Sequence, residues 1–417
     1  MLNIEFKPRV FLNQFLLCLL AALMVFTPLY KYQKMIFILF LFVLWFLNAL
    51  MLDGSYFNKS IPLMCFCIVV ILLDILVGIF SNSSSNMLLG INKMPTFIWA
   101  LIYLFYKDKI HLLNKPIKII LAMIAISAAF TLIGNLQYPG ASRLLASSGL
   151  NDYYVADREF YRTINIGGYG FVFSLVFLSM PILLFWRKKK NVVLLIFLAL
   201  LVSTVFVASY FIGIILMVAM IVFGFINPKH IWQFFILICL CILAVFAFSN
   251  IILEWLVEFG GNINSDILIQ RATELLTGEY FNGLGDDNNR IQIYINAIIN
   301  WSKRPLFGAL QGHVDNLRRS GHSALLGYLE TYGLFSIIYY VFYYNTYKNI
   351  KSSFGNSSLK NFFLIYYICF ILFIFIDVFD TFCDLGLTVF FVAPVLFQLM
   401  DDNIGCSSVD NYDWRYS

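Results

Sequence analysis

Charge is what this sequence has least of. Only 12% of its 417 residues are charged, whereas 61% are hydrophobic and 18% are aromatic. Soluble globular chains carry roughly 25% charged residues. The mean hydropathy of +0.83 agrees with that shortage. A chain with so little charge cannot cover a surface that faces water, so the sequence predicts a membrane protein with most of its residues in the bilayer.

Several catalytic motifs are also missing. The sequence contains no Walker loop, no HExxH, no GxSxG and no Asp-x-Asp. Most of the eight cysteines lie in apolar runs, and Cys65-Met-Cys67 and Cys239-Leu-Cys241 lack CxxC spacing. We therefore expect no cofactor, no metal and no disulfide framework. The net charge of +5 comes without a solvated basic run, so nucleic acid is not an expected partner.

What the sequence does contain is a series of long apolar runs. A membrane-spanning helix needs about 20 such residues. We predict an all-α polytopic protein in which residues 1–417 form a single integral membrane domain with about twelve helices. The predicted helices are 11–30, 35–52, 61–80, 88–106, 116–134, 165–186, 191–207, 209–227, 231–252, 323–346, 361–379 and 384–400. The run 88–106 contains Lys93 and Pro95, so a re-entrant segment is the alternative there.

Short basic connections predict the orientation. Twelve spans put both termini on one side, and the positive-inside rule makes that side cytoplasmic. The residues behind this assignment are Lys107, Lys109, Lys115, Arg187 to Lys190, Lys229, Lys348 and Lys351.

Two longer connections then lie outside, at 135–164 and 253–322, and the second precedes the last three helices. Segments 265–278 and 289–305 within it have the pattern of helices, the latter amphipathic.

The outer connections carry arginines that topology does not require. Arginine recognises phosphates through several hydrogen bonds. We therefore predict a binding site for an anionic, lipid-linked substrate such as a polyprenyl diphosphate. Its candidate residues are Arg143, Arg290, Arg318 and Arg319. Long loops cross membranes regardless of charge, so solvated arginines that meet lipid headgroups are the plain alternative.

His322 opens the helix that follows the second loop. Its unperturbed pKa near neutrality suits a general acid or base. Ser323 and Glu330 are seven residues apart and would share a helix face. A helix-capping serine beside an interfacial histidine is the plain alternative.

Acidic residues within apolar runs are costly and suggest function. Asp74 is the one predicted to be clearly buried, and Asp377, Asp380 and Asp384 gather near the outer end of the last hairpin. A proton-coupled transporter would use such a residue, but the sequence suggests no basic partner for Asp74 inside the membrane.

The order of residues in the second loop resembles the O-antigen ligase and polymerase superfamily, including the Wzy type. The matching features are Arg290, the turn Pro305-Leu306-Phe307-Gly308, His322-Ser323, and Glu330 with Gly333. Arg143 is similar to an arginine in the family's earlier outer loop. One departure is Ser209-Tyr210, where the family often has Ser-Arg.

The resemblance implies a GT-C-type glycosyltransferase in the bacterial cytoplasmic membrane. It would polymerise undecaprenyl-diphosphate-linked repeat units into O-antigen or capsule, with a chain-length regulator as a candidate partner. His322, Arg290 and Glu330 would be catalytic. The alternatives are a ligase that moves finished polymer to lipid A–core and, from another class, a lipid-linked oligosaccharide flippase. A flippase would carry charge along a path inside the bundle.

Overall fold

The computed structural model describes residues 2–80, 88–146, 155–226, 249–262, 269, 273, 290–311 and 323–401, which form helices and no strand. The first half of the chain contains α1 (Leu2–Val25), η1 (Thr27–Tyr32), α2 (Met35–Leu52), α3 (Ser55–Phe80), α5 (Leu89–Tyr106), η2 (Ile110–Leu113), α6 (Asn114–Gln137), α7 (Ala141–Ala146), α8 (Val155–Thr163), α9 (Tyr169–Lys189), α10 (Val192–Val207) and α11 (Phe211–Phe225). The second half contains α13 (Ser249–Asn262), α16 (Arg290–Lys303), η4 (Gly308–Gln311), α17 (Ala324–Tyr332), η5 (Gly333–Ser336), α18 (Ile337–Lys351), α19 (Ser357–Ile376), α20 (Cys383–Leu387), η6 (Thr388–Val392) and α21 (Ala393–Leu399).

The helices agree with the predicted apolar runs. Among the described residues, seven helical segments are long and apolar enough to cross a membrane. Three shorter apolar helices accompany them: α10, α11 and the segment from α20 to α21. Most of the predicted span 231–252 and of the predicted helix 265–278 lies outside the described residues. The all-helical, multi-pass character is therefore supported, while the number of twelve spans stays a prediction.

The structure bears on two features that the sequence left open. The run 88–106 forms one continuous 18-residue helix, α5, with Pro95 inside it, but α5 is not among the seven helices that are long and apolar enough to cross a membrane. The apolar stretch 191–227 divides where predicted. Helix α10 ends at Val207 and α11 begins at Phe211, and Ser209 between them has a φ of 57°. That left-handed backbone position cannot continue a right-handed helix, so the chain reverses there.

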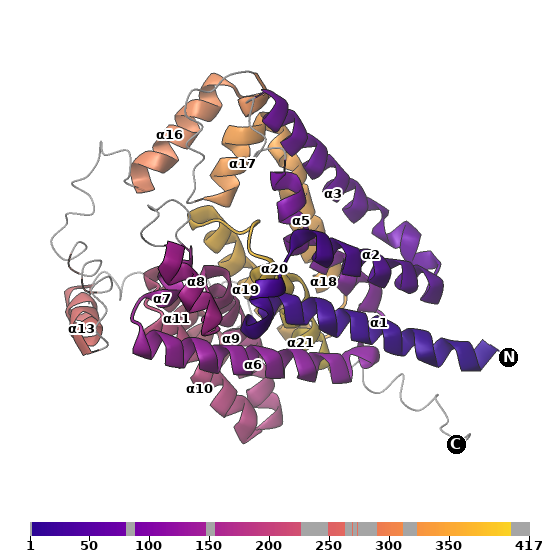
Figure 1. The fold of residues 1–417 in the computed structure, drawn as a ribbon, viewed down its shortest axis with the longest axis horizontal. Coiled ribbons are helices and arrows are strands. Elements are labelled where there is room, and N and C mark those ends of the chain that lie inside the picture. Colours follow the sequence, from indigo (N-terminus) through magenta and orange to yellow (C-terminus); the bar gives the residue numbers. More distant parts are fainter. Residues whose placement is uncertain are drawn as a thin grey trace.

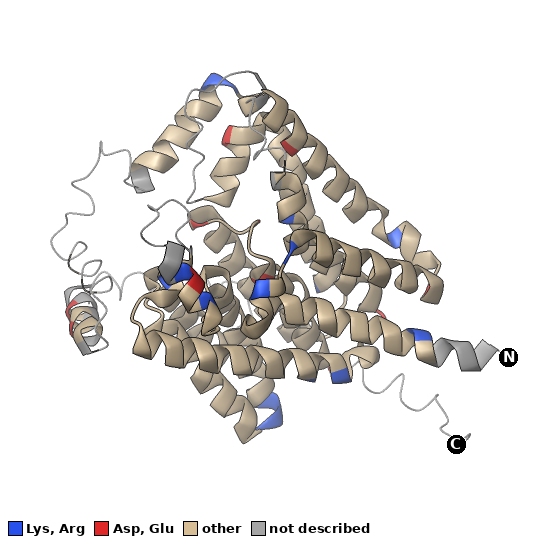
Figure 2. Ribbon diagram, viewed as in Figure 1, with Lys and Arg blue, Asp and Glu red and all other residues tan. Residues whose placement is uncertain are grey.

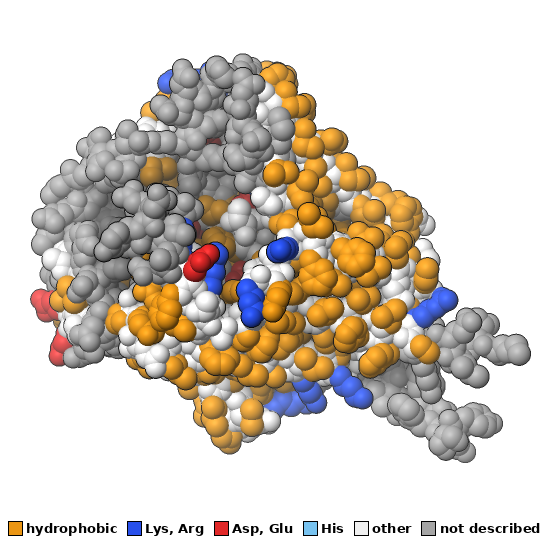
Figure 3. Space-filling view, viewed as in Figure 1, with side chains coloured by type: hydrophobic (Ala, Val, Ile, Leu, Met, Phe, Trp, Pro, Cys, Tyr) orange, Lys and Arg blue, Asp and Glu red, His pale blue; other side chains and the backbone are white. Residues whose placement is uncertain are grey.

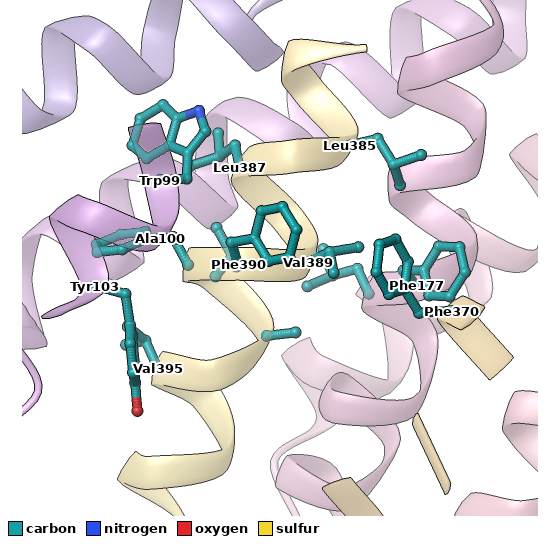
Figure 4. Packing of buried hydrophobic residues seen from close by; sticks show 14 of the residues in the cluster. Trp99, Ala100, Tyr103, Phe177, Phe370, Leu385, Leu387, Val389, Phe390 and Val395 are labelled. Atoms are coloured by element: carbon teal, nitrogen blue, oxygen red, sulfur yellow. The ribbon is translucent and has the colours of Figure 1, made fainter. Parts of the chain in front are cut away.

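The segment α20–η6–α21 forms the centre of the bundle. Its side chains from Leu385 to Val395 are at most 1% exposed wherever they are hydrophobic. Figure 4 shows Leu387 and Phe390 lying between Trp99 of α5 and Phe177 of α9. A helix that is apolar all round belongs inside a bundle. The π-helical turn η6 ends at Val392, two residues before Pro394, which has no N–H to donate to the preceding turn.

The connections predicted to be cytoplasmic are tied to one another and to neighbouring helix ends. Lys107 Nζ donates to Ser352 Oγ over 2.8 Å, and Lys188 Nζ donates to the Met400 carbonyl over 2.5 Å. Lys109 Nζ lies 2.6 Å from Asp53 Oδ2. Figure 2 shows that Lys and Arg sit mostly near helix ends, with long uncharged stretches between them. These basic connections therefore meet at one end of the bundle, as the sequence predicts.

The helices around the core present apolar surface. Helix α2 exposes Ile36, Phe40, Val43, Leu47 and Met51. Helix α6 packs beside α1 (Figure 1) and also exposes isoleucines. In Figure 3 the face over α1, α2, α3 and α6 is mostly hydrophobic, with few charged side chains. Hydrocarbon around this face would remove the cost of such exposure, as expected for a membrane protein.

The Asp53–Lys109 ion pair gives a stability prediction for this end. Hydrogen bonds from Lys109 and Ser55 lower the pKa of Asp53 to about 2 from 3.8. A depressed carboxyl pKa adds stability above about pH 4, and that stability is lost as the pH falls toward about 2. We expect Asp53→Asn to destabilise the protein by at most about 1 kcal/mol at neutral pH, because the pair is partly exposed.

Thermal unfolding of the protein in detergent, at neutral pH and near pH 3, would measure this. The difference between wild type and variant should shrink at the lower pH. Asp108→Asn is the matched control, because its partner Lys59 holds it in a more exposed pair with side-chain exposures of 49% and 64%. An effect of Asp53→Asn that stays the same at both pH values would contradict the prediction.

Candidate functional site

The end of the predicted second outer loop and the helix that follows it form a hairpin, α16 and α17, that two glycines hold together. Gly308 and Gly333 have φ values of 54° and 57°. A Cβ atom on Gly308 would lie 2.7 Å from the Gly333 nitrogen and from the Glu330 carbonyl oxygen, which is too close for any side chain. The Leu334 N–H also donates to the Leu306 carbonyl over 3.1 Å. The turn before η4 therefore packs directly on the end of α17, and only glycine fits at the contact.

Glu330 faces the other helix of this hairpin. Its side chain is 5% exposed, and Asn300 Nδ2 of α16 donates to Glu330 Oε1 over 2.7 Å. The described contacts of Glu330 thus connect α17 with the helix that begins at Arg290. The Arg290 side chain is outside what the structure describes, as are His322, Arg318 and Arg319 altogether.

Ser323 caps the helix and does not share a helix face with Glu330. It adopts an extended backbone conformation before α17, and its side-chain oxygen accepts a hydrogen bond from the Leu326 N–H over 3.2 Å. This is N-cap geometry, which satisfies one free donor of the first helical turn. Ser323 therefore fixes where α17 starts, directly after His322 in the sequence.

Helix α16 has its most apolar positions on the outside. Ile295, Ile298 and Ile299 are 39–50% exposed, whereas Ala297 is buried and the Tyr294 hydroxyl donates to the Ile376 carbonyl over 2.8 Å. The predicted amphipathic helix is therefore present, and its isoleucines face away from the protein. Figure 1 shows α16 and α17 side by side at one extremity of the molecule.

The outer turn, defined as residues 377–384, runs from the end of α19 into the first turn of α20 and connects the hairpin to the bundle. The Ala324 N–H of α17 donates to the Asp377 carbonyl over 3.1 Å. All three aspartates of the turn are buried, with exposures of 6–8%. Each has a partner on a different element: Tyr169 of α9 donates to Asp377, Lys93 of α5 lies 3.4 Å from Asp380, and Tyr30 of η1 donates to Asp384 over 3.4 Å.

The helix that carries Arg143 reaches the same turn through two tyrosines. The Tyr210 hydroxyl donates to the Ser142 carbonyl over 2.8 Å, and the Tyr210 ring packs edge-on against Tyr169 at a centroid distance of 5.0 Å. Tyr169 in turn bonds to Asp377. The half-buried Arg143 therefore lies in a short helix tied to the outer turn that also holds the start of α17. Two loops that are far apart in the sequence converge there.

The expectation that Asp74 has no basic partner is wrong. Lys93 Nζ of α5 lies 3.1 Å from Asp74 Oδ2, and both side chains are almost fully buried. Tyr332 of α17 donates to Asp74 Oδ1 over 2.5 Å and accepts from Lys93 over 2.8 Å. A signal for the pair is present in the sequence, because Lys93 stands in an apolar run one hairpin away from Asp74. Local pattern alone, however, predicts only that Lys93 interrupts a helix.

Comparison with known proteins does not assign the chain to a family. No model of a known protein family matches the chain, and no curated protein matches it either. The likeness to the O-antigen ligase and polymerase superfamily therefore rests only on the residues that carry it.

The glycine contact gives a prediction for the site. We expect Gly333→Ala to cost about 1–3 kcal/mol in backbone strain alone, because φ is positive there. The added methyl group would also clash with the Leu306 backbone. Thermal unfolding and protease sensitivity of the loop in detergent would measure the loss. Gly54→Ala is the control, since nothing lies within 4 Å of its Cβ position. Equal stability of both variants would show that the hairpin contact is not needed.

Proposed function

We propose that this protein polymerises undecaprenyl-diphosphate-linked oligosaccharide repeat units at the outer face of the bacterial cytoplasmic membrane. The observation that carries the proposal is the convergence at the outer turn. The Arg143 helix and the start of α17, which directly follows His322, are both hydrogen-bonded or packed against residues attached to Asp377. These are the segments that the resemblance marks as functional, and a reaction between them needs them close together.

The chemistry of the proposed reaction suits these side chains. The bond between the anomeric carbon and a diphosphate oxygen breaks, and the leaving diphosphate keeps the electron pair. Arg143, Arg290, Arg318 and Arg319 would stabilise that developing charge, which fixed cations do best in a site that excludes water. An acceptor hydroxyl oxygen forms the new bond to the same carbon and gives its proton to His322.

Glu330 has a narrower part in this proposal. Its carboxylate accepts a hydrogen bond from Asn300, so it would hold α16 and with it the backbone of Arg290. That makes it a positioning residue. Orienting the acceptor hydroxyl from α17 is the role that the resemblance implies, and the described contacts of Glu330 point to α16 instead.

The orientation is part of the proposal. With both termini cytoplasmic, the end that carries Lys107, Lys109 and Lys188 faces the cytoplasm, as the positive-inside rule requires. The outer turn and the α16–α17 hairpin then face outward, where the exposed isoleucines of α16 can enter the outer leaflet. A lipid-linked substrate would approach the hairpin from that leaflet.

A flippase for lipid-linked oligosaccharides is the second candidate. The ion pair between Asp74 and Lys93 inside the bundle favours it, because transporters carry charged residues along internal paths. The pair also shows that the charged residues of this protein are not confined to the connections between helices. A ligase that moves finished polymer to lipid A–core would use the same outer site as the polymerase.

Deletion of the gene distinguishes the three activities on a gel of the cell's surface polysaccharide. For a polymerase we expect core carrying a single repeat unit and no ladder. Full-length polymer left on its lipid carrier, with bare core, would instead indicate the ligase. Repeat units trapped on the inner leaflet would indicate the flippase and overturn the proposal.

Single substitutions test the site. We expect Arg143→Ala, Arg290→Ala and His322→Ala each to reduce polymer by about 100-fold or more, since loss of one charge-stabilising donor costs about 10²–10³ in rate. Immunoblots of membranes should show unchanged protein. Arg162→Ala is the matched control, because Arg162 is an exposed arginine of the first outer loop. Near-normal ladders from all three variants would refute the site.

A further inference from the structure

Three ionisable side chains meet inside the bundle at a place that the proposed transfer reaction does not use. Lys93 Nζ lies 3.1 Å from Asp74 Oδ2 and 3.4 Å from Asp380 Oδ2. The side chains of Lys93, Asp74 and Asp380 are 7%, 0% and 8% exposed. They come from α5, α3 and the outer turn, so the lysine cluster (Asp74, Lys93 and Asp380) joins segments from both ends of the chain.

Three tyrosine rings lie close to the ammonium group of the lysine cluster. The ring centroids of Tyr328, Tyr332 and Tyr339 lie 5.3–6.0 Å from Lys93 Nζ. The ionisable groups that face the cluster within the described residues are therefore Asp74 from α3, Lys93 from α5, Tyr328 and Tyr332 from α17, Tyr339 and Tyr343 from α18, and Asp380 from the outer turn.

The charges of these groups do not balance. Phenols are neutral near neutral pH, so the tyrosines offer hydrogen bonds and ring faces but no charge. Two carboxylates facing one ammonium leave one negative charge in excess. The exposed fraction of each of the three side chains is at most 8%. Burying an unpaired charge is far more costly than binding a proton, and carboxyl groups that share a site do not both ionise readily.

The contacts differ between the two carboxyl groups. Asp74 accepts a hydrogen bond from Tyr332 over 2.5 Å at Oδ1, and its Oδ2 has the shorter distance to Lys93. Asp74 therefore has two close polar partners, the Tyr332 hydroxyl and the Lys93 ammonium. Asp380 is farther from Lys93 and lies in the outer turn, toward the predicted outer end of the bundle.

We infer that Asp74, Lys93 and Asp380 form a binding site for one exchangeable proton, which Asp380 carries when the cluster is neutral. The site is independent of the polymerase proposal, because it needs no sugar or diphosphate. The binding or release of this proton would nevertheless affect the outer turn. Asp380 is three residues from Asp377, whose carbonyl holds the start of α17, and Thr96 of α5 donates to the Asp380 carbonyl over 2.9 Å.

Infrared spectroscopy of the purified full chain in detergent tests the site directly. A protonated carboxyl group has a C=O stretching band that a carboxylate lacks, and that band shifts in D₂O. We expect wild type to show one carboxylic acid equivalent from this cluster. Asp380→Asn and Asp74→Asn should both lose it, since the single remaining carboxyl group then ionises opposite Lys93.

Lys93→Met makes the opposite change. Without the ammonium, both carboxyl groups must hold protons, so the band from this cluster should grow about twofold, to two equivalents. Should this variant fail to fold, Lys93→Met with Asp74→Asn keeps one carboxyl group and no cation, and it should show one equivalent. Asp384→Asn is the control for other buried acids, because Asp384 has its own partner, Tyr30, outside the cluster.

Spectra of Asp74→Asn and Asp380→Asn that both match wild type in the carboxylic acid region would overturn the inference, since both groups would then be ionised in the native protein. The inference would also be wrong if Lys93→Met adds no band while the protein stays folded. Neither outcome depends on whether the gene deletion gives the pattern of a polymerase.

Discussion

A lysine buried in an apolar bundle must have anionic partners within a few ångströms, and the partners of Lys93 determine much of this fold. Its ammonium group draws Asp74 of α3 and Asp380 of the outer turn to α5, and Tyr332 brings α17 to the same place. Removing one partner from such a group leaves a charge that the bundle cannot solvate. The charged centre therefore ties together elements that hydrophobic packing alone would leave free to slide.

The outer turn connects this charged centre to the α16–α17 hairpin at the surface. Its three aspartates are each held by a different element, and its backbone accepts hydrogen bonds from α5 and α17. In the proposed reaction, a turn with so many independent attachments would help to keep cationic side chains at fixed distances from a developing charge. The hairpin of α16 and α17 is attached there while its isoleucine face points away from the protein.

The lengths of the apolar runs were enough to predict most of the long helices that the structure describes. Run length located α2 to the residue, and the break at Ser209 fell where Ser209-Tyr210 interrupts the apolar stretch. It was harder to predict which side chains contact one another. Lys93 was visible in the sequence, but pairing it with Asp380 requires knowing that the outer turn folds back onto α5. Nor does helix spacing show that Ser323 caps α17 instead of sharing its face with Glu330. Contacts between distant segments depend on tertiary packing, which a local pattern does not encode.

The central position of α20–η6–α21 also has a consequence for assembly. Asp74 and Lys93 lie in consecutive helices of the described chain, so they can enter the membrane as a pair whose charges largely cancel. The helices that fill the core are made much later, after every other described segment. Until these helices are made, the contacts of α5 and α9 with α20, η6 and α21 cannot form. The central packing of the bundle can therefore be completed only at the end of synthesis.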